Sequence, residues 1–211
     1  MAISSLSGER IVLSNADYLI VTPYTSESTI GNVSYDIVDI VGDTLSFTPD
    51  DNNVNAKESE FADTPLFENI TLGKIQFAAT CIDFRNEIMK EIFGWKEGKE
   101  AMYAPNGYKD LYAVVEVGFK NEGIALVVPK LKLNSKAVIS SLKTGTGECQ
   151  LAGTAYIADL KVGTDTTATK TPMAFVNRGA DTNGVYAETE YVVGTTEFKT
   201  GNGDTSGVQN A

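Results

Sequence analysis

The side chains that enzymes use most often near neutral pH are scarce in this chain. Its 211 residues include no histidine and two cysteines, Cys81 and Cys149. Histidine is the commonest metal ligand and the usual general base near neutral pH, and without it neither thiol can form a cysteine–histidine pair. Both cysteines lie in strand-like stretches, where a small apolar side chain fits well. We therefore expect buried free thiols rather than a nucleophile or a disulfide.

Two short motifs look like ligand-binding loops but lack residues that binding requires. Asp51, Asn53 and Asn55 alternate like calcium ligands, yet the twelfth position of such a loop, where a bidentate glutamate belongs, is Ala62. The segment 94–99, GWKEGK, is one residue shorter than a phosphate loop and follows a predicted helix instead of preceding one. A glycosidase needs only two carboxylates, but the spacing of the acidic residues singles out no pair. We predict no catalytic residues, no metal and no cofactor, and hence no enzyme.

The charge balance argues against a nucleic-acid-binding protein. Asp and Glu number 28 against 17 Lys and Arg, which gives a formal net charge of −11, whereas binding to phosphates relies on clustered lysines and arginines.

An apolar content of 42% is typical of a globular chain, and one hydrophobic core suffices at this length. The first residues lack the charged and apolar regions of a secretory signal, and no apolar run is long enough to cross a bilayer. We expect a soluble protein made in the cytoplasm.

Alternating apolar residues predict a protein built mainly of β-strands. The clearest case is 111–119, which has the pattern of a strand with one buried face. The segment 124–133 follows a polar turn and completes an antiparallel hairpin, in which Pro129 indicates an edge or a bulge. Further strands are expected over 75–81 and 151–157. Weaker candidates lie at 11–13, 19–22, 34–41, 173–176 and 186–193.

One segment, from Asp83 to Gly94, has the period of an amphipathic helix. Phe84, Ile88 and Ile92 recur every four residues on its apolar face, and charged residues occupy the other side. Asp83 can cap the first turn through its carboxylate, and Gly94 can end the helix in a left-handed conformation. We expect the apolar face of this helix to pack against a sheet.

Residues 43–69 are unusually acidic. They contain seven Asp or Glu and one Lys, and we expect a long exposed loop, a feature that is uncommon in compact domains unless it serves a function. Phe61, Leu66 and Phe67 would be unfavourable on the surface of a free monomer, so they either contact a neighbouring molecule or fold back on their own domain. Residues 194–211 are rich in Gly, Thr, Asn and Ser, and we expect a flexible or late-ordering arm there.

Four features of the chain follow one another in an order that is typical of one protein family. They are Val41-Gly42-Asp43 before the acidic loop, 75–80 leading into the helix that ends Phe93-Gly94-Trp95, the strand 113–117, and the strand 124–133 with its Pro-Lys and alternating lysines. In this order the chain resembles the major tail protein, or tail tube protein, of long-tailed bacteriophages. The resemblance is strongest over 33–160, and we assign residues 1–193 to a single tail-tube-like domain.

The resemblance implies an antiparallel β-sandwich with one flanking helix. Six copies would join edge to edge into a ring, and stacked rings would form the tail tube, a negatively charged conduit for DNA delivery. The implied partners are other copies of the chain and the terminator, tape measure and distal tail proteins. DNA would be met only in transit, without specific binding, and no membrane would be involved. The implied location is the virion tail, which is assembled in the cytoplasm of the bacterial host.

A tube of this kind would give particular residues a role in contacts between rings. We expect these contacts from the acidic loop, through Asp50, Asp51, Phe61, Leu66 and Phe67. Open sheet edges, which a monomer has to protect, would be paired within a ring.

Glu116, on the first strand of the central hairpin, is the candidate for an acid that faces the lumen. An electronegative wall would repel DNA phosphates and let the genome pass. The alternative for this residue is a solvated outer face that keeps the protein soluble.

A second class of function fits the same features. A carbohydrate- or protein-binding β-sandwich module, such as a virion decoration or receptor-binding protein, would use the strands, the tyrosines and the loop without forming a tube.

Overall fold

The computed structural model describes residues 16–50, 53–59, 62–71, 74–107, 109–119, 124–138, 147–177 and 189–200. The predicted strand at 11–13, the predicted contact residues Asp51 and Phe61, and the end of the predicted arm from 201 onward lie outside these residues.

The described chain is mainly β, as predicted, and its sheets are antiparallel. The elements in chain order are β1 (Ala16–Pro23), β2 (Tyr35–Ile37), β3 (Ser46–Pro49), β4 (Asn53–Ser59), β5 (Ala62–Thr71), β6 (Ile75–Cys81), α1 (Asn86–Glu91), β7 (Lys96–Glu97), β8 (Met102–Tyr103), β9 (Lys109–Phe119), β10 (Ile124–Val138), β11 (Glu148–Ala155), β12 (Ala158–Val162), β13 (Thr169–Thr171), β14 (Ala174–Asn177), β15 (Glu190–Val193) and β16 (Thr196–Lys199).

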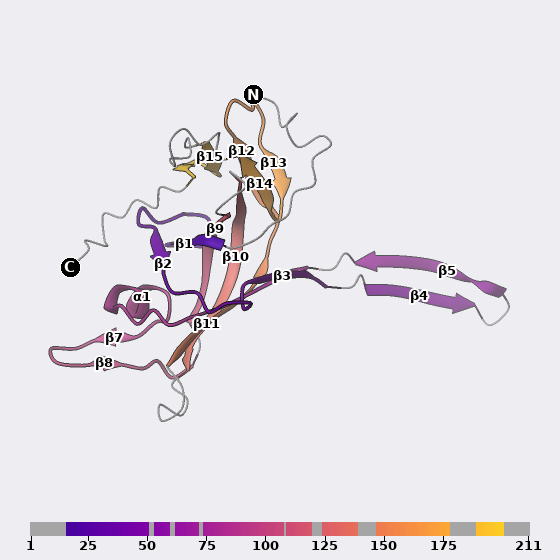
Figure 1. The fold of residues 1–211 in the computed structure, drawn as a ribbon. Coiled ribbons are helices and arrows are strands. Elements are labelled where there is room, and N and C mark those ends of the chain that lie inside the picture. The colour runs from indigo at the N-terminus through magenta and orange to yellow at the C-terminus, as the bar shows by residue number, and fades with distance from the viewer. Residues whose placement is uncertain are drawn as a thin grey trace.

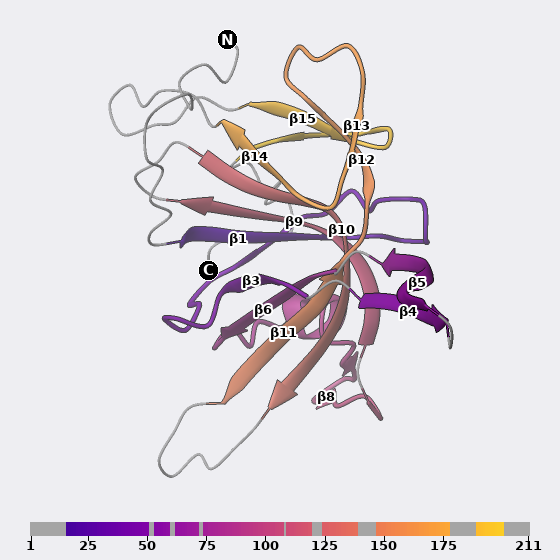
Figure 2. The ribbon, with the colours of Figure 1, turned by 90° about the vertical axis from the view of Figure 1, so that its right-hand side faces the viewer.

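The longest strands, β9 and β10, form the predicted central hairpin of an eight-stranded sheet. The strand order is β2-β1-β9-β10-β11-β6-β3, and β14 pairs with β10 beside this path. The β9–β10 register shifts between Val128 and Leu131, so the predicted irregularity at Pro129 is confirmed as a bulge. Before the bulge β10 pairs with β14, and after it β10 pairs with β11. One strand therefore belongs to two differently directed parts of the sheet (Figure 2).

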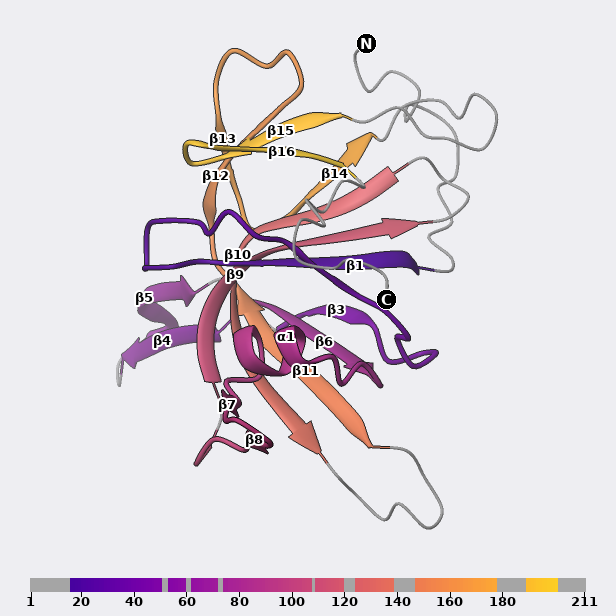
Figure 3. The same cartoon turned by 90° about the vertical axis from the view of Figure 1, so that its left-hand side faces the viewer.

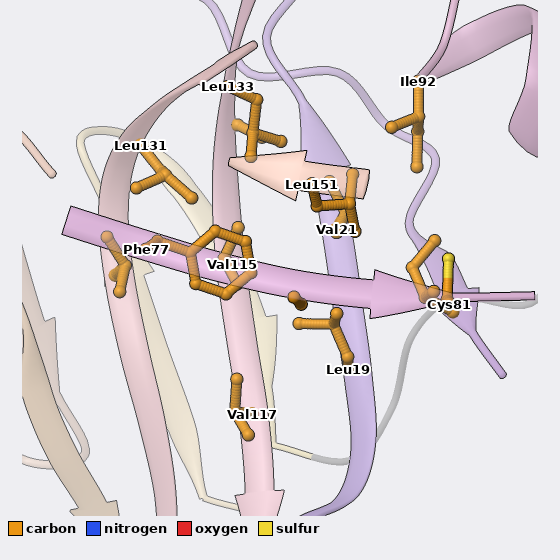
Figure 4. Packing of buried hydrophobic residues seen from close by; sticks show 14 of the residues in the cluster. Leu19, Val21, Phe77, Cys81, Ile92, Val115, Val117, Leu131, Leu133 and Leu151 are labelled. Atoms are coloured by element: carbon orange, nitrogen blue, oxygen red, sulfur yellow. The ribbon is translucent and has the colours of Figure 1, made fainter. Parts of the chain in front are cut away.

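The two parts of this sheet share one hydrophobic core. Leu19 of β1, Val115 of β9 and Phe77 of β6 are each at most 2% exposed and belong to one cluster. Figure 4 shows their side chains close together, although β6 crosses in front of β1 and β9. Ile88 of helix α1 and Ile92, which directly follows it, belong to the same core, and Figure 3 shows the helix beside β6 and β11.

A second sheet covers the opposite face of β9 and β10. Its strand order is β13-β12-β15-β16, and it contributes Leu160 and Tyr191 to a cluster with Val114 of β9 and Val127 of β10. Figures 1 and 2 show this sheet at one end of the molecule, with β1, β9 and β10 between it and β6 and β11. The prediction that β9 buries one face is therefore wrong, because the segment 113–119 is buried on both faces.

The helix is shorter than predicted, and one residue of its predicted apolar face is misassigned. Ile88 and Ile92 are fully buried as expected, but Phe84 precedes the helix and is 39% exposed. Asp83 does not cap the helix: its carboxylate accepts hydrogen bonds from the backbone and guanidinium of Arg85, the residue at the N-cap position. Gly94 does end the segment in the left-handed region, at a φ of 72°.

The acidic segment contains strands where a loop was expected. β3 pairs with β6 at the sheet edge, and β4 pairs with β5 as a separate two-stranded hairpin. In Figure 1 this β4–β5 hairpin extends away from the body of the molecule. The loop prediction failed because polar, charged residues weaken the strand signal while backbone pairing across a hairpin still satisfies the peptide groups.

The predicted C-terminal arm also begins too early. Residues 194–200 complete the β15–β16 hairpin, with a left-handed turn at Gly194 and the ring of Phe198 stacked on Tyr191 at 5.1 Å between centroids. Thr200 is buried as well. A strand of four residues was missed because its only large apolar side chain is Phe198.

The core arrangement predicts which aromatic residues hold the fold together. Phe77→Ala should lower the free energy of unfolding by about 3–5 kcal/mol, since it empties a fully packed position. The control Tyr103→Ala truncates a residue that is 60% exposed. This change should alter the free energy of unfolding by less than about 0.5 kcal/mol. Urea titrations monitored by circular dichroism measure both values, and similar losses in the two variants would contradict the assigned core.

A buried carboxylate and candidate assembly surfaces

The predicted lumen-facing acid, Glu116, lies in the interior of the described chain. It is 3% exposed, because the second sheet covers the face of β9 on which it lies. Tyr18 of β1 donates a hydrogen bond to Oε1 at 2.5 Å, and Tyr191 of β15 donates one to Oε2 at 2.8 Å. The prediction of an accessible acid at this position is therefore wrong. Glu116 instead connects the two sheets.

Gly118 is what allows Tyr18 to reach this carboxylate. The two residues are cross-strand partners in the β1–β9 pairing. A Cβ atom added to Gly118 would lie 2.1 Å from the Tyr18 ring, far closer than van der Waals contact permits. The missing side chain thus makes room for the ring to lie across β9.

The charge of Glu116 also affects the pKa of Tyr191. Burial raises the pKa of Tyr191 well above its ordinary value, and the negative charge of Glu116 raises it further. The phenol therefore stays protonated and able to donate. A carboxylate buried in this way is stable only while its acceptor positions are filled.

The two cysteines are buried free thiols, as predicted. They are directly opposite each other in the β6–β11 pairing. The hydrogen bond with Cys81, followed by burial, raises the pKa of the Cys149 thiol. A protonated, buried thiol is a poor nucleophile.

The strongest candidate for a contact with other molecules is the β4–β5 hairpin. Within the described residues no third strand pairs with either of its strands, so both outer edges are open. Its base is closed by a hydrogen bond from the backbone N–H of Asp50 to the carbonyl of Lys74, at 2.7 Å. Gln76 of β6 also donates to the Asp50 carboxylate, at 2.7 Å. Of the predicted contact residues, Asp50 thus lies exposed at the base, and Leu66 and Phe67 lie on β5.

The eight-stranded sheet and the second sheet end in short strands. In the described part of the chain, β2 and β3 end the main path, and β13 and β16 end the second sheet. β14 pairs with β10 alone and carries Phe175, which is 42% exposed. Strands of three or four residues offer few backbone groups for uncontrolled pairing, but they can accept a matching strand.

A set of aromatic and cationic side chains escaped the sequence analysis. Tyr24, Tyr112 and Tyr156, with Lys74 and Lys130, form what we call the tyrosine–lysine surface. Tyr112 stands edge-on to the other two rings, at 6.4 Å and 6.1 Å between centroids. The residues come from segments far apart in the chain, so no local pattern identifies the set. The sequence pointed to this set only through the alternating lysines near Pro129 and the general abundance of tyrosines.

Searches of protein-family models, of curated proteins and of solved structures each return no match to this chain. In the ranges that the structure describes, no three Cys, Asp or Glu side chains gather to hold a metal ion. The helix found there is too short to span a membrane.

The carboxylate connection predicts a specific stability loss. Glu116→Gln keeps the shape of the side chain but removes the charge, and hydrogen bonds to charged groups each contribute about 1.5–3 kcal/mol. We expect the free energy of unfolding to fall by about that amount. The control Glu197→Gln, at an exposed residue, should have almost no effect. Equal unfolding midpoints for Glu116→Gln and the parent chain would show that the connection does not stabilise the fold.

The tyrosine pKa predicts a pH dependence at the alkaline end. The folded state holds the Tyr191 proton more tightly than the unfolded chain, so stability is complete below the unfolded pKa of about 10 and declines as the pH rises above it. Tyr191→Phe should flatten this decline without removing it, because burial also raises the pKa of Tyr24. Urea midpoints between about pH 8 and about pH 11 test this; identical slopes in both proteins would rule it out.

Proposed function

We propose that this chain is a structural virion protein that polymerises, as stacked sixfold rings, into the tail tube of a long-tailed bacteriophage. The observation that carries the proposal is the β4–β5 hairpin, which extends from the body with both edges unpaired in the described chain (Figure 1). A hairpin of two strands is at best marginally stable by itself in water. Contact with another molecule would stabilise it, and an identical copy is the partner that is always present.

The sheet architecture supports a role in assembly. Packing of β1 and β9 against β6 across one core supports the antiparallel β-sandwich that the resemblance implies. The exposed Phe175 on the short strand β14 gives one sheet edge an apolar side chain, which favours strand addition between copies over a fully solvated edge. In our proposal such edges close the ring, while the hairpin joins one ring to the next.

The chemistry of the described side chains favours a structural role over catalysis. The main polar cluster, Tyr18, Glu116 and Tyr191, is covered by the second sheet and holds two layers together. A substrate could reach it only by separating those layers. The facing thiols of Cys81 and Cys149 are likewise buried.

The net charge of −11 suits a conduit that passes DNA without binding it, since like charges repel across a narrow channel. Glu116 does not contribute to that wall, because it is buried. In the proposed virion tail, the remaining partners are the terminator, tape measure and distal tail proteins at the ends of the tube.

Removing the hairpin tests the proposal directly. Because Asp50 and Lys74 are hydrogen-bonded to each other, a short glycine linker can replace residues 53–71 without stretching the body. We expect the full chain to form tubes in negative-stain micrographs. The deletion variant should stay folded by circular dichroism and form single rings or smaller species, but no tubes, by light scattering and microscopy. A matched control shortens another exposed turn, at 164–168 between β12 and β13, and should still assemble.

Two outcomes would count against the proposal. If the full 22.6 kDa chain stays monomeric at high concentration, the carbohydrate- or protein-binding module becomes the better account. If the deletion variant forms normal tubes, the hairpin is not the inter-ring contact.

A further inference from the structure

The tyrosine–lysine surface combines three aromatic rings with two lysine side chains that lie over them. Lys130 Nζ is 4.7 Å from the centroid of the Tyr112 ring and 5.8 Å from that of Tyr24. Lys74 Nζ is 5.3 Å from the centroid of Tyr156. Lys74 is exposed and the other four residues are half-buried, so the set is accessible to a partner.

These two ammonium groups lack the partner that a neighbouring lysine has. Lys132 forms an ion pair with Asp110 at 3.3 Å. Within the described residues, neither Lys74 nor Lys130 has a carboxylate within 4.0 Å. Lys130 donates a hydrogen bond to the carbonyl of Glu27, at 2.9 Å, so its charge meets tyrosine rings and a carbonyl but no carboxylate. The surface therefore presents cationic and aromatic groups in the combination that favours an acidic partner with apolar residues.

The β4–β5 hairpin has the complementary composition. Between residues 53 and 71 it carries four acidic residues, at positions 58, 60, 63 and 68, and one lysine, at position 57. The segment also contains Phe61, Leu66 and Phe67. Figure 1 shows β4 and β5 extended away from the body of their own molecule, so the hairpin as a whole is placed to reach another copy; Phe61 and the acid at position 60 lie outside the described residues.

We propose that the tyrosine–lysine surface of one copy binds the β4–β5 hairpin of a second copy. The proposal rests on the self-assembly argued above and names the receiving surface. Hairpin carboxylates pair with Lys74 and Lys130, and apolar hairpin residues contact the rings of Tyr24, Tyr112 and Tyr156. Since Lys74 lies at the base of its own hairpin, each copy would present donor and acceptor next to each other. Contacts of this kind repeat from copy to copy and so propagate a stack.

Two complementary variants test this pairing. The first replaces residues 53–71 with the glycine linker, so it keeps the surface and lacks the hairpin. The second, K74E/K130E, keeps the hairpin and reverses the charge of the surface. We expect neither variant to form tubes alone. An equimolar mixture should form a complex that contains equal numbers of the two variants and has about twice the mass of either alone, detected by light scattering after gel filtration. Self-association of K74E/K130E should weaken by at least about 10-fold.

The control variant K96E/K99E makes the same charge change at two exposed lysines near β7 and should assemble like the parent chain. If K74E/K130E is misfolded by circular dichroism, the neutral variant K74Q/K130Q replaces it, with the same expected loss of association. Assembly of the parent chain should also weaken as salt is raised, because the contact pairs exposed charges.

The outcomes separate this inference from the proposed function. Normal tubes from K74E/K130E, or a mixture of folded variants that does not associate, would overturn the hairpin contact and leave the tube intact. If the parent chain never assembles, both the hairpin contact and the proposed tail-tube function are overturned. A third outcome is that K74E/K130E forms normal tubes but is no longer retained on an alginate column that retains the parent chain. This result would overturn the hairpin contact and assign the surface to an acidic carbohydrate.

Discussion

Burial of the β9–β10 pair on both faces is the constraint that shapes the rest of the structure. One face packs against β6 and α1, and the other packs against the second sheet. A strand covered on both sides cannot leave a charged side chain unpaired, yet β9 carries Glu116. The carboxylate is stable because Tyr18, on the neighbouring strand β1, and Tyr191, from the covering second sheet, both donate to it. Gly118 is then required beside it, since any side chain there would displace the Tyr18 ring. The position of one acid thus determines residues in three strands.

Local pattern predicted much of this architecture and failed where distant segments meet. Alternation located β6, β9, β10 and most of β11, and Pro129 indicated the bulge that turns β10. The alternation of apolar and polar residues along a strand shows which face of the sheet a residue lies on. It does not show whether another part of the chain covers that face. Glu116 was therefore assigned to open space, because nothing near it in sequence predicts the second sheet that contributes Tyr191. Phe84 was assigned to the core because its spacing continues the helical period, although the helix begins after it.

The same limit applies to the candidate contact sites. The acidic composition of residues 43–69 marked the segment as unusual, but composition could not distinguish a loop from a hairpin with polar strands. The tyrosine–lysine surface was harder still to predict, since its residues come from five separate places in the chain and meet only after β1, β9, β10, β11 and β6 have paired. Open strand edges, an extended hairpin and a cationic aromatic surface occur together on one small acidic protein. In the assembly that we propose, repeated contact between identical copies would account for all three.

The closed base of the β4–β5 hairpin has a consequence for how such chains can diverge. Asp50 and Lys74 are hydrogen-bonded to each other, and Gln76 secures the same position to β6. Strands β4 and β5 lie between these residues and extend away from the body (Figure 1), so we expect insertions, deletions and exchanges there to leave the folded body unchanged. Natural variation in length and sequence can therefore accumulate in this one segment. If the proposed contact between copies is made, a lineage could alter which copies recognise each other by changing the hairpin, while the interior that holds Glu116 stays under strict packing constraint.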